Sequence, residues 1–342
     1  MGLFAAAPAQ AAPTAVTCGQ TVVHNVILQS DLVCPAWGLV IGADRLDVNL
    51  NGHTITGPIT DPSVGVDIGN HTGTTIRNGT VRGFGTGTSG NGAHYTVVSG
   101  MTFVNTVVTG VLLVDSQRNT VRMTHVTHDA GDPNYAAILL YHSGYNVIAL
   151  NVLTFNGDGI LLDGASHNTI AGNTSSDSGA GVDLVNSSDD NTITANRTDL
   201  NGDSGVLLDQ QSNGNRITLN TAAGNGFGGV VVGASDHNTV LYNITNNNAG
   251  SGVVVTDNAV GTLVQGNRAS GNGANPPGCT PFCPLLDDGI HVDAATTLLR
   301  ANTADNNADL GIDAVAGVVD GGGNEAHGNG NPAQCAVVLC RP

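Results

Sequence analysis

The sequence lacks the residues on which charged helices and polyanion-binding surfaces depend. Its 342 residues contain no lysine, a single glutamate at Glu325 and only 4% aromatic residues. Because Lys and Glu are among the best charged helix formers, their near absence argues against a helical fold. Ten arginines stand against 27 acidic residues, and the net charge of −17 argues against nucleic acid or anionic membranes as partners.

Long apolar runs are missing as well. No segment approaches the roughly 18 uninterrupted apolar residues of a membrane-spanning helix, so no membrane span is expected. Residues 1–12 resemble the end of a secretory signal, with an A-x-A cleavage site at 9–11 but without the basic region that opens such signals. We therefore expect a signal remnant over 1–12, or alternatively a disordered Ala/Pro leader, and one domain over 13–342.

Glycine and asparagine, by contrast, are abundant and recur in a repeating unit. The unit is clearest at 156–173 (NGDGILLDGASHNTIAGN) and returns at 178–196, 203–220 and 227–243. A period in the twenties is typical of a solenoid. The glycines that open successive apolar runs are spaced by 22, 24, 24 and 23 residues: Gly159, Gly181, Gly205, Gly229 and Gly252.

Each unit contains two short apolar runs, such as 160–162 and 169–170, bounded by Gly, Ser, Asn and Asp. Such runs predict two strands per coil, and a leucine-rich repeat is disfavoured because its helical half is absent. The alternation of a strand points Leu161 and Asp163 outward. We expect an all-β solenoid of about eleven coils of 22–24 residues, about 50 Å long at about 4.8 Å per coil.

Asparagine recurs at three places in the unit. One set precedes the second apolar run, one follows it and one leads into the next coil, as Asn146, Asn151 and Asn156 do. Asn tolerates left-handed backbone angles, and stacked copies can pass side-chain hydrogen bonds from coil to coil. We interpret these asparagines as structural ladders rather than catalytic residues.

The pattern G-[IV]-x-[LV]…N-x-[IV]-x-x-N, together with the LNGHTITG run at 50–57, carries a family resemblance. It resembles the single-stranded right-handed parallel β-helices of the pectate-lyase-like superfamily, and most closely the generic secreted bacterial proteins grouped with the NosD type. The resemblance covers about 18–323. It implies a secreted, extracellular protein that acts on a polysaccharide as a lyase or hydrolase, although the superfamily also holds epimerases and non-enzymes. A copper-handling role lacks the expected enrichment in Cys, Met and His.

The six cysteines form three local pairs, and disulfides are the expected use of such pairs in an exported chain. Metal binding is the alternative for the second pair, but no other thiol or His pair lies at zinc-finger spacing. The pairs are Cys18 with Cys34, Cys279 with Cys283, and Cys335 with Cys340.

Two units break the period, through insertions at 128–135 and 273–286. Insertions in solenoids map to loops on one face, often the binding face. Six coils lie between them, so the loops could wall a groove about 29 Å long, which suits a chain of several sugar units.

The first candidate site lies on outward strand positions between those loops and comprises Asp163, Asp183 and Asp209. One coil of offset and two residues along the strand place Asp163 and Asp183 about 8 Å apart, which suits an acid and a base acting across a water, or Ca²⁺ ligands. Polygalacturonase-like hydrolases carry carboxylates on this face; a DGI occurs at 158–160 and a DDGI at 287–290, but their GHG is absent. The alternative is that exposed Asp only solubilises the chain.

The second candidate would perform β-elimination on a uronic acid, which needs a cation, a base and an acid. Arg122 or a bound Ca²⁺ would neutralise the carboxylate, and His128, Tyr141 or His142 would exchange protons. Asp132-Pro133-Asn134 resembles the DPH run of alginate epimerases, with Asn in place of His. The alternative is that these residues cap a loop on an apolar face.

The third candidate is a divalent-metal site formed by Asp288, His291, Asp293 and Asp313. His291 and Asp293 share one face of an expected strand and Asp313 follows one coil later. Ordinary surface polarity is the alternative.

Outward positions on several coils are apolar, and an exposed apolar stripe usually marks a covered or binding surface. A loop, the N-terminal segment, a partner or a second copy could lie on it, which keeps open a non-catalytic carbohydrate-binding or cell-surface scaffold. Its members are Leu112, Val114, Leu139, Leu161, Leu207, Val231 and Val254.

Overall fold

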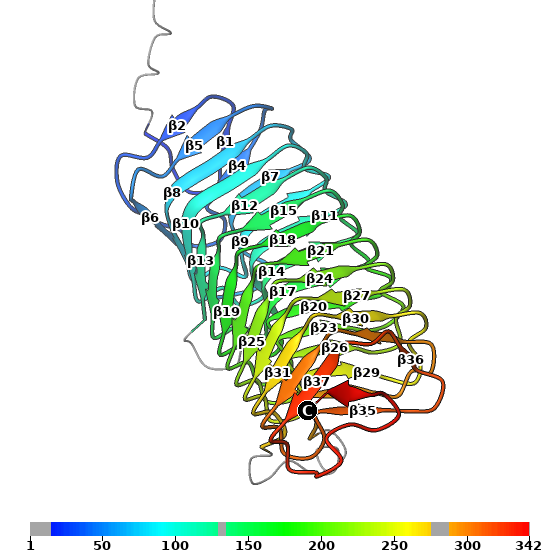
Figure 1. Cartoon of the computed structure of the whole chain (residues 1–342). Coiled ribbons are helices and arrows are strands. Elements are labelled where there is room, and N and C mark those ends of the chain that lie inside the picture. The colour runs from blue at the N-terminus through cyan, green and yellow to red at the C-terminus, as the bar shows by residue number, and fades with distance from the viewer. Residues whose placement is uncertain (1–14, 129–134, 275–286, 342) are drawn as a thin grey trace, which may run out of the picture.

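The computed structural model describes residues 15–128, 135–274 and 287–341, and these residues form a parallel β-solenoid (Figure 1). Strands from successive coils pair in parallel register and stack along one long axis. None of the described residues is helical, and the described part of the chain therefore contains no helix that could cross a membrane. The all-β solenoid expected from the repeat is confirmed.

The first sheet contains one strand from each coil, in chain order along the stack. Its thirteen strands correct the expected count of about eleven coils. The strands are β1 (Gln20–Val22), β4 (Leu39–Ile41), β7 (Val64–Gly69), β9 (Thr86–Asn91), β11 (Thr109–Val114), β14 (Ala136–Tyr141), β17 (Asp158–Asp163), β20 (Val182–Val185), β23 (Val206–Leu208), β26 (Val230–Val232), β29 (Val253–Val255), β32 (Ile290–Val292) and β35 (Ile312–Ala314).

A second row of strands corresponds to the second apolar run of each unit. Two long strands, β8 (Thr75–Arg82) and β10 (Val97–Val104), belong to both this row and the third row, and they join the two rows into one sheet. The other members are β2 (Val26–Ile27), β5 (Asp47–Asn49), β12 (Thr120–Arg122), β15 (Val147–Ala149), β18 (Thr169–Ala171), β21 (Thr192–Thr194), β24 (Arg216–Thr218), β27 (Thr239–Leu241), β30 (Leu263–Gln265), β33 (Leu298–Arg300) and β36 (Val319–Asp320).

The third row was not expected, since two strands per coil were predicted. Its inward residues change from large and apolar (Phe103, Leu153) to small or polar (Ser175, Thr198), so hydrophobicity does not reveal it. Its strands are β3 (Leu32–Val33), β6 (Thr54–Thr56), β13 (His125–Thr127), β16 (Val152–Thr154), β19 (Thr174–Ser176), β22 (Arg197–Asp199), β25 (Thr221–Ala223), β28 (Ile244–Asn246), β31 (Arg268–Ser270), β34 (Thr303–Asp305), β37 (Asn324–His327) and β38 (Cys340–Arg341).

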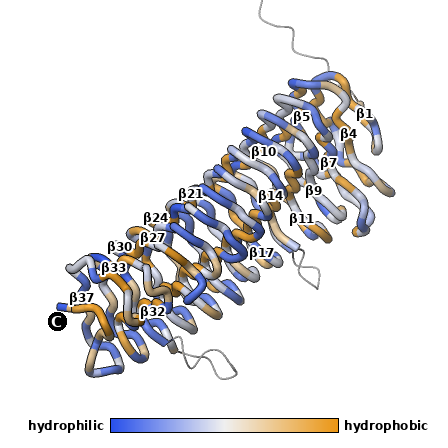
Figure 2. Tube along the Cα trace, turned by 90° about the vertical axis from the view of Figure 1, so that its right-hand side faces the viewer, coloured by the Kyte–Doolittle hydropathy of each residue, from blue (hydrophilic) through white to orange (hydrophobic). Residues whose placement is uncertain are grey.

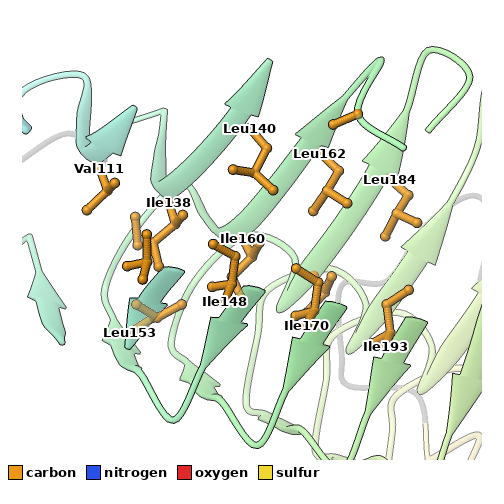
Figure 3. Close-up of a cluster of buried hydrophobic side chains, with 14 of the residues drawn as sticks. Val111, Ile138, Leu140, Ile148, Leu153, Ile160, Leu162, Ile170, Leu184 and Ile193 are labelled. Carbon is orange, nitrogen blue, oxygen red and sulfur yellow. The ribbon is translucent and has the colours of Figure 1, made fainter. Parts of the chain in front are cut away.

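The core is one continuous column of apolar side chains between the first sheet and the other rows. In Figure 3, Ile160 and Leu162 of β17 point toward Ile148 and Ile170 of the second row, and all four are fully buried. Figure 2 shows hydrophobic and hydrophilic segments recurring along the whole stack. Each coil therefore buries its apolar residues mainly against its neighbours, as in other solenoids.

Glycine opens most units because the first sheet approaches the third row closely at that position. A Cβ at Gly181 would lie 2.5 Å from the carbonyl oxygen of Gly205 and 2.6 Å from Cβ of Thr198. The first sheet and the third row therefore approach too closely there for any larger residue.

The asparagine ladders are confirmed. The Nδ2 of Asn151 donates to Oδ1 of Asn173 at 2.9 Å, and Asn173 continues to Asn196 at 3.0 Å. All three are buried, but none has a positive φ; the left-handed residue is the one before each, such as Leu150 before Asn151 (φ 58°). Asn recurs in the ladders because its side-chain amide is both a donor and an acceptor. The expectation that these asparagines adopt left-handed backbone angles was wrong.

Two of the three expected disulfides are present, Cys18–Cys34 with 5.3 Å between Cα atoms and Cys335–Cys340 with 6.1 Å. They lie in the first and last coils. The expected pair Cys279 and Cys283 lies outside the described residues.

Candidate functional site

Asp183 lies on the outer face of the first sheet, between two leucines. In the parallel register it pairs with Leu161 on one side and Leu207 on the other. Its Oδ1 is buried and has no hydrogen-bond partner among the described residues. Burial first, and then the charges of Asp158 and Asp203, raise the pKa of Asp183 to about 7. A carboxyl group in this environment can carry a proton at neutral pH.

Asp158 belongs to the same group, although the sequence analysis did not select it as a site residue. Its Oδ1 accepts the backbone N–H of Ala180 in the next coil at 2.8 Å. Burial, followed by the charge of Asp203, raises the pKa of Asp158. The DGI run at 158–160 was the sequence signal for Asp158, which lies directly before the glycine that opens the apolar run.

Asp203 supplies the third carboxylate, from the coil after Asp183, and its Oδ1 accepts the hydroxyl of Ser204 at 2.9 Å. Three consecutive coils thus contribute Asp158, Asp183 and Asp203, which we call the proximal cluster. Tyr135 lies beside it: burial and then the charges of Asp163, Asp158 and Asp183 raise the pKa of its phenol.

The other two predicted carboxylates have local partners. Asp163 pairs in register with Val185, one coil and two residues from Asp183 as expected, and accepts the Nδ2 of Asn186 at 2.8 Å. Asp209 accepts the backbone N–H of Gln210 at 2.7 Å. Asp183 alone of the predicted three has a buried oxygen without a partner among the described residues.

The predicted elimination residues are divided between faces. Tyr141 ends β14 in the first sheet, and its ring centroid lies 3.9 Å from that of His142. Arg122 is exposed on β12 in the second row, which pairs with β10 and β15. His128 is buried, with no partner for its Nδ1 among the described residues. Residues 129–134, which contain the Asp-Pro-Asn run, lie outside the description.

The four residues predicted to hold a metal do converge, and we call them the distal cluster. The Nδ1 of His291 lies 2.9 Å from Asp288 Oδ2 and 3.6 Å from Asp313 Oδ2, and its Nε2 lies 3.2 Å from Asp293 Oδ2. Burial lowers the pKa of His291, but the hydrogen bond to Asp288 and the charges of Asp293 and Asp288 outweigh it and raise the pKa to about 9.

One donor atom each from Asp288, His291 and Asp313 lies within 4.8 Å of the others, and the same holds for Asp287, Asp288 and Asp309. The carboxylate oxygens are ligands that Ca²⁺ accepts. Both imidazole nitrogens, however, already face carboxylates. A metal ion would have to displace the proton of His291, so the geometry fits an ion-paired cluster better than a ready metal site.

The seven residues of the apolar stripe are buried or half-buried. This corrects the expectation that the stripe is an exposed surface. Leu139, Leu161, Val231 and Val254 are buried, and the remaining three are half-buried. Leu139 and Leu161 form a small cluster outside the main core with Ala136, Leu112 and Val185 packed against it. Packing between neighbouring coils thus covers Leu139 and Leu161, so this part of the stripe offers little apolar area to a second copy.

The groove expected between the two insertions depends on 129–134 and 275–286, which the description does not cover. The spacing is confirmed, since six coil steps separate β14 and β32 in the first sheet. Among the described residues, a hollow of about 350 Å³ lies at the C-terminal end and is lined by residues such as Pro332 and Leu339 without titratable groups. The proximal and distal clusters, both on the first sheet, are therefore the candidate sites.

The fold and this face define a parallel β-solenoid with carboxylate clusters on one sheet. The family described as "Right handed beta helix region" matches residues 136–308, and the chain belongs to this family. The expected right-handed parallel β-helix is thereby confirmed. Comparison with curated proteins gives no match.

Solved structures with a similar fold include the mannuronan C-5 epimerase AlgE6 A-module of Azotobacter vinelandii, at 14% identity and a TM-score of 0.68, covering 92% of this chain and 91% of that one. The periplasmic alginate epimerase AlgG has 14% identity, a TM-score of 0.61 and coverage of 87% and 76%. The catalytic domain of a GH87 alpha-1,3-glucanase has 13% identity, a TM-score of 0.53 and coverage of 97% and 70%. At such identities the likeness shows the fold alone.

Proposed function

We propose that the protein is a secreted glycoside hydrolase that cleaves a polysaccharide on the outer face of its first sheet. The observation that carries this proposal is Asp183, whose carboxyl is largely buried between Leu161 and Leu207 with a pKa raised to about 7. Hydrolysis of a glycosidic bond needs a carboxylic acid that is still protonated near neutral pH, and this is the usual result of burial beside other carboxylates.

The chemistry assigns Asp183 as the proton donor to the glycosidic oxygen. As the bond from the anomeric carbon to that oxygen breaks, the leaving sugar keeps the donated proton. A neighbouring carboxylate either attacks the anomeric carbon, forming a glycosyl ester that water then hydrolyses, or takes a proton from a water that attacks this carbon directly. Asp158 and Asp203 are the candidates, because their charges act on Asp183 most strongly.

Three further observations support the proposal. The signal-like segment and the two disulfides favour export. The structural neighbours bear names of proteins that act on alginate or on a glucan. The separation of Arg122 from Tyr141 between two sheets weakens the lyase alternative, since a cation and a proton-transfer group must meet at one sugar.

The test is a screen of the purified full chain against neutral, acidic and amino polysaccharides, following both reducing ends and the ultraviolet absorbance of unsaturated uronates. New reducing ends without that absorbance are the expected result. Absorbance would replace the proposal with a lyase. Binding without either signal would favour the non-catalytic scaffold.

A further inference from the structure

The chain keeps its arginines off the first sheet, whereas acidic residues lie in strands of every row. The chain has no lysine, and none of its arginines lies in a strand of the first sheet as the structure describes it. Eight lie in β8, β12, β22, β24, β31, β33 or β38, with two in β8, and the other two lie in turns before the second row. The ten are Arg45, Arg77, Arg82, Arg118, Arg122, Arg197, Arg216, Arg268, Arg300 and Arg341.

Away from the first sheet, arginines serve local purposes. The guanidinium of Arg77 forms two hydrogen bonds to Asp47, at 2.8 and 2.9 Å. Arg118 lies between the rings of Tyr95 and Tyr145, 5.9 and 5.5 Å from their centroids. These arginines are not directed at the carboxylates of the first sheet.

The outer face of the first sheet carries acids in two groups. The proximal cluster has Asp163 and Asp209 nearby, and the distal cluster has Asp287 and Asp309 nearby. Five coil steps separate β17 from β32, which is about 24 Å. Among the residues that the structure describes, His291 is the one cation in a strand of this sheet.

A sugar chain lying along this face would therefore meet surplus negative charge at both clusters. A polyuronate would place its carboxylates against those of the protein, with no arginine to neutralise them. A neutral sugar would leave the negative charge of the two clusters without a counter-charge. An ammonium group would supply the missing counter-charge, since carboxylates accept hydrogen bonds from each of its three N–H groups.

We propose that the substrate of this face is a polysaccharide of amino sugars with free, positively charged amino groups, and not a polyuronate. This inference rests on the proposed function for the cleavage step. The second cluster extends the binding site several sugars beyond the bond that is cut, because it lies on the same face and five coils away.

Binding is tested with oligomers of glucosamine, with the same oligomers fully N-acetylated, and with oligogalacturonates. N-acetylation removes the positive charge and keeps the backbone, so it is the matched control. The acid variant Asp183→Asn prevents turnover during calorimetry. At low salt the glucosamine oligomer should bind at least about tenfold more tightly than its acetylated form, and salt should shrink the difference because it screens exposed charges.

A pair of protein variants locates the charge effect. Asp163→Asn removes one charge from the first sheet and keeps an oxygen that can accept from Asn186. Asp177→Asn makes the same change at an exposed turn after the third row, where its φ of 54° suits Asn. We expect Asp163→Asn to weaken glucosamine binding by about threefold and Asp177→Asn to leave it unchanged, as for single exposed charges.

The outcomes separate this inference from the proposed function. Equal or tighter binding of the acetylated or uronate oligomers overturns the inference. Hydrolysis of a neutral glucan without glucosamine binding overturns the inference but retains the hydrolase. Salt-sensitive glucosamine binding without hydrolysis of any polymer supports the ligand class and removes the enzyme.

Discussion

The proximal and distal clusters occupy equivalent positions of the repeat, five coils apart. Residues 158–163 read DGILLD and residues 288–293 read DGIHVD, and each run is followed one coil later by an outward aspartate, Asp183 or Asp313. The first aspartate of each accepts a backbone N–H from the next coil, at 2.8 Å for Asp158 and 2.9 Å for Asp288. The backbone places the two sets of carboxylates in the same way.

The clusters differ at one central side chain, which is Leu161 in the proximal cluster and His291 in the distal one. Leucine gives the carboxylates no counter-charge, so burial raises the pKa of Asp183 to about 7. Histidine lies within 4 Å of three carboxylates and becomes a stable imidazolium, with its own pKa raised to about 9. The residue at this one position therefore decides which group of the cluster is protonated at neutral pH. With Leu161 it is the carboxyl of Asp183, and with His291 it is the imidazole itself.

The largest expected effect is on catalysis. Asp183→Asn keeps the size of the side chain but removes the proton donor, and kcat/KM should fall by about 10²–10⁴-fold, as for loss of a general acid. Reducing-end kinetics on the preferred substrate measure it, with Asp177→Asn as the control. Activity near the wild-type level would remove Asp183 from the mechanism.

Converting the distal cluster into the proximal one should destabilise the fold. His291→Leu leaves Asp288, with 3% of its side chain exposed, and Asp313 without their cation. Breaking a buried ion pair costs about 3–5 kcal/mol in the free energy of unfolding. Urea unfolding at pH 7 measures it, with His237→Leu, at an exposed turn position, expected to change it by about 0.5 kcal/mol or less. An equal effect of both variants would contradict the ion-paired interpretation.

The protonation of Asp183 should also appear in the pH dependence of stability. Its carboxyl has a pKa of about 7 in the folded protein against 3.8 as the ordinary value, so the folded state holds the proton more tightly. This favours folding below about pH 4 and is lost as the pH rises through about 7, by about 4 kcal/mol in total. Unfolding of wild type and Asp183→Asn between pH 4 and 8 measures the difference, which should grow with pH. Parallel curves would rule out the raised pKa.

The smallest effect is expected from converting the proximal cluster into the distal one. Leu161→His places an imidazole beside Asp183, and an adjacent positive charge lowers the pKa of a carboxyl group. The alkaline limb of the pH–rate profile should move down by about one pH unit or more, with about tenfold lower activity at neutral pH. Leu161→Met keeps the site apolar and serves as the control. An unmoved limb would mean that Leu161 does not set the protonation of Asp183.

The parts of the fold that follow from local chemistry were predictable. The glycine spacing predicted the solenoid because the close approach at Gly181 recurs in the regular units, as at Gly159, Gly205, Gly229 and Gly252. The buried ladders, such as Asn151 to Asn173, were predictable because one residue type must recur where its donor and acceptor meet copies of itself. The third row was not, because Ser175 and Thr198 face inward without a hydrophobic signal.

The site residues also divide into those that were predictable from the sequence and those that were not. All four residues of the distal cluster were named, His291 and Asp293 from a shared strand face and Asp313 from the coil spacing, and the structure brings them together. Asp183 was named, but its partner Asp158 was not, because two carboxylates of one strand look alike until burial and partners are known. Asp158 accepts a backbone N–H from Ala180 in the next coil, whereas Asp163 accepts from the side chain of Asn186.

The sequence by itself determined the repeat, the two-faced strands, the ladders and which carboxylates share a face, since each follows from residue spacing along one coil. Only the tertiary structure decided which carboxylates lose water, which gain a counter-charge and which apolar residues are covered. Those properties depend on the neighbouring coil, 22 or more residues away in the chain, and on whether it presents Leu161 or His291 at the centre of the cluster.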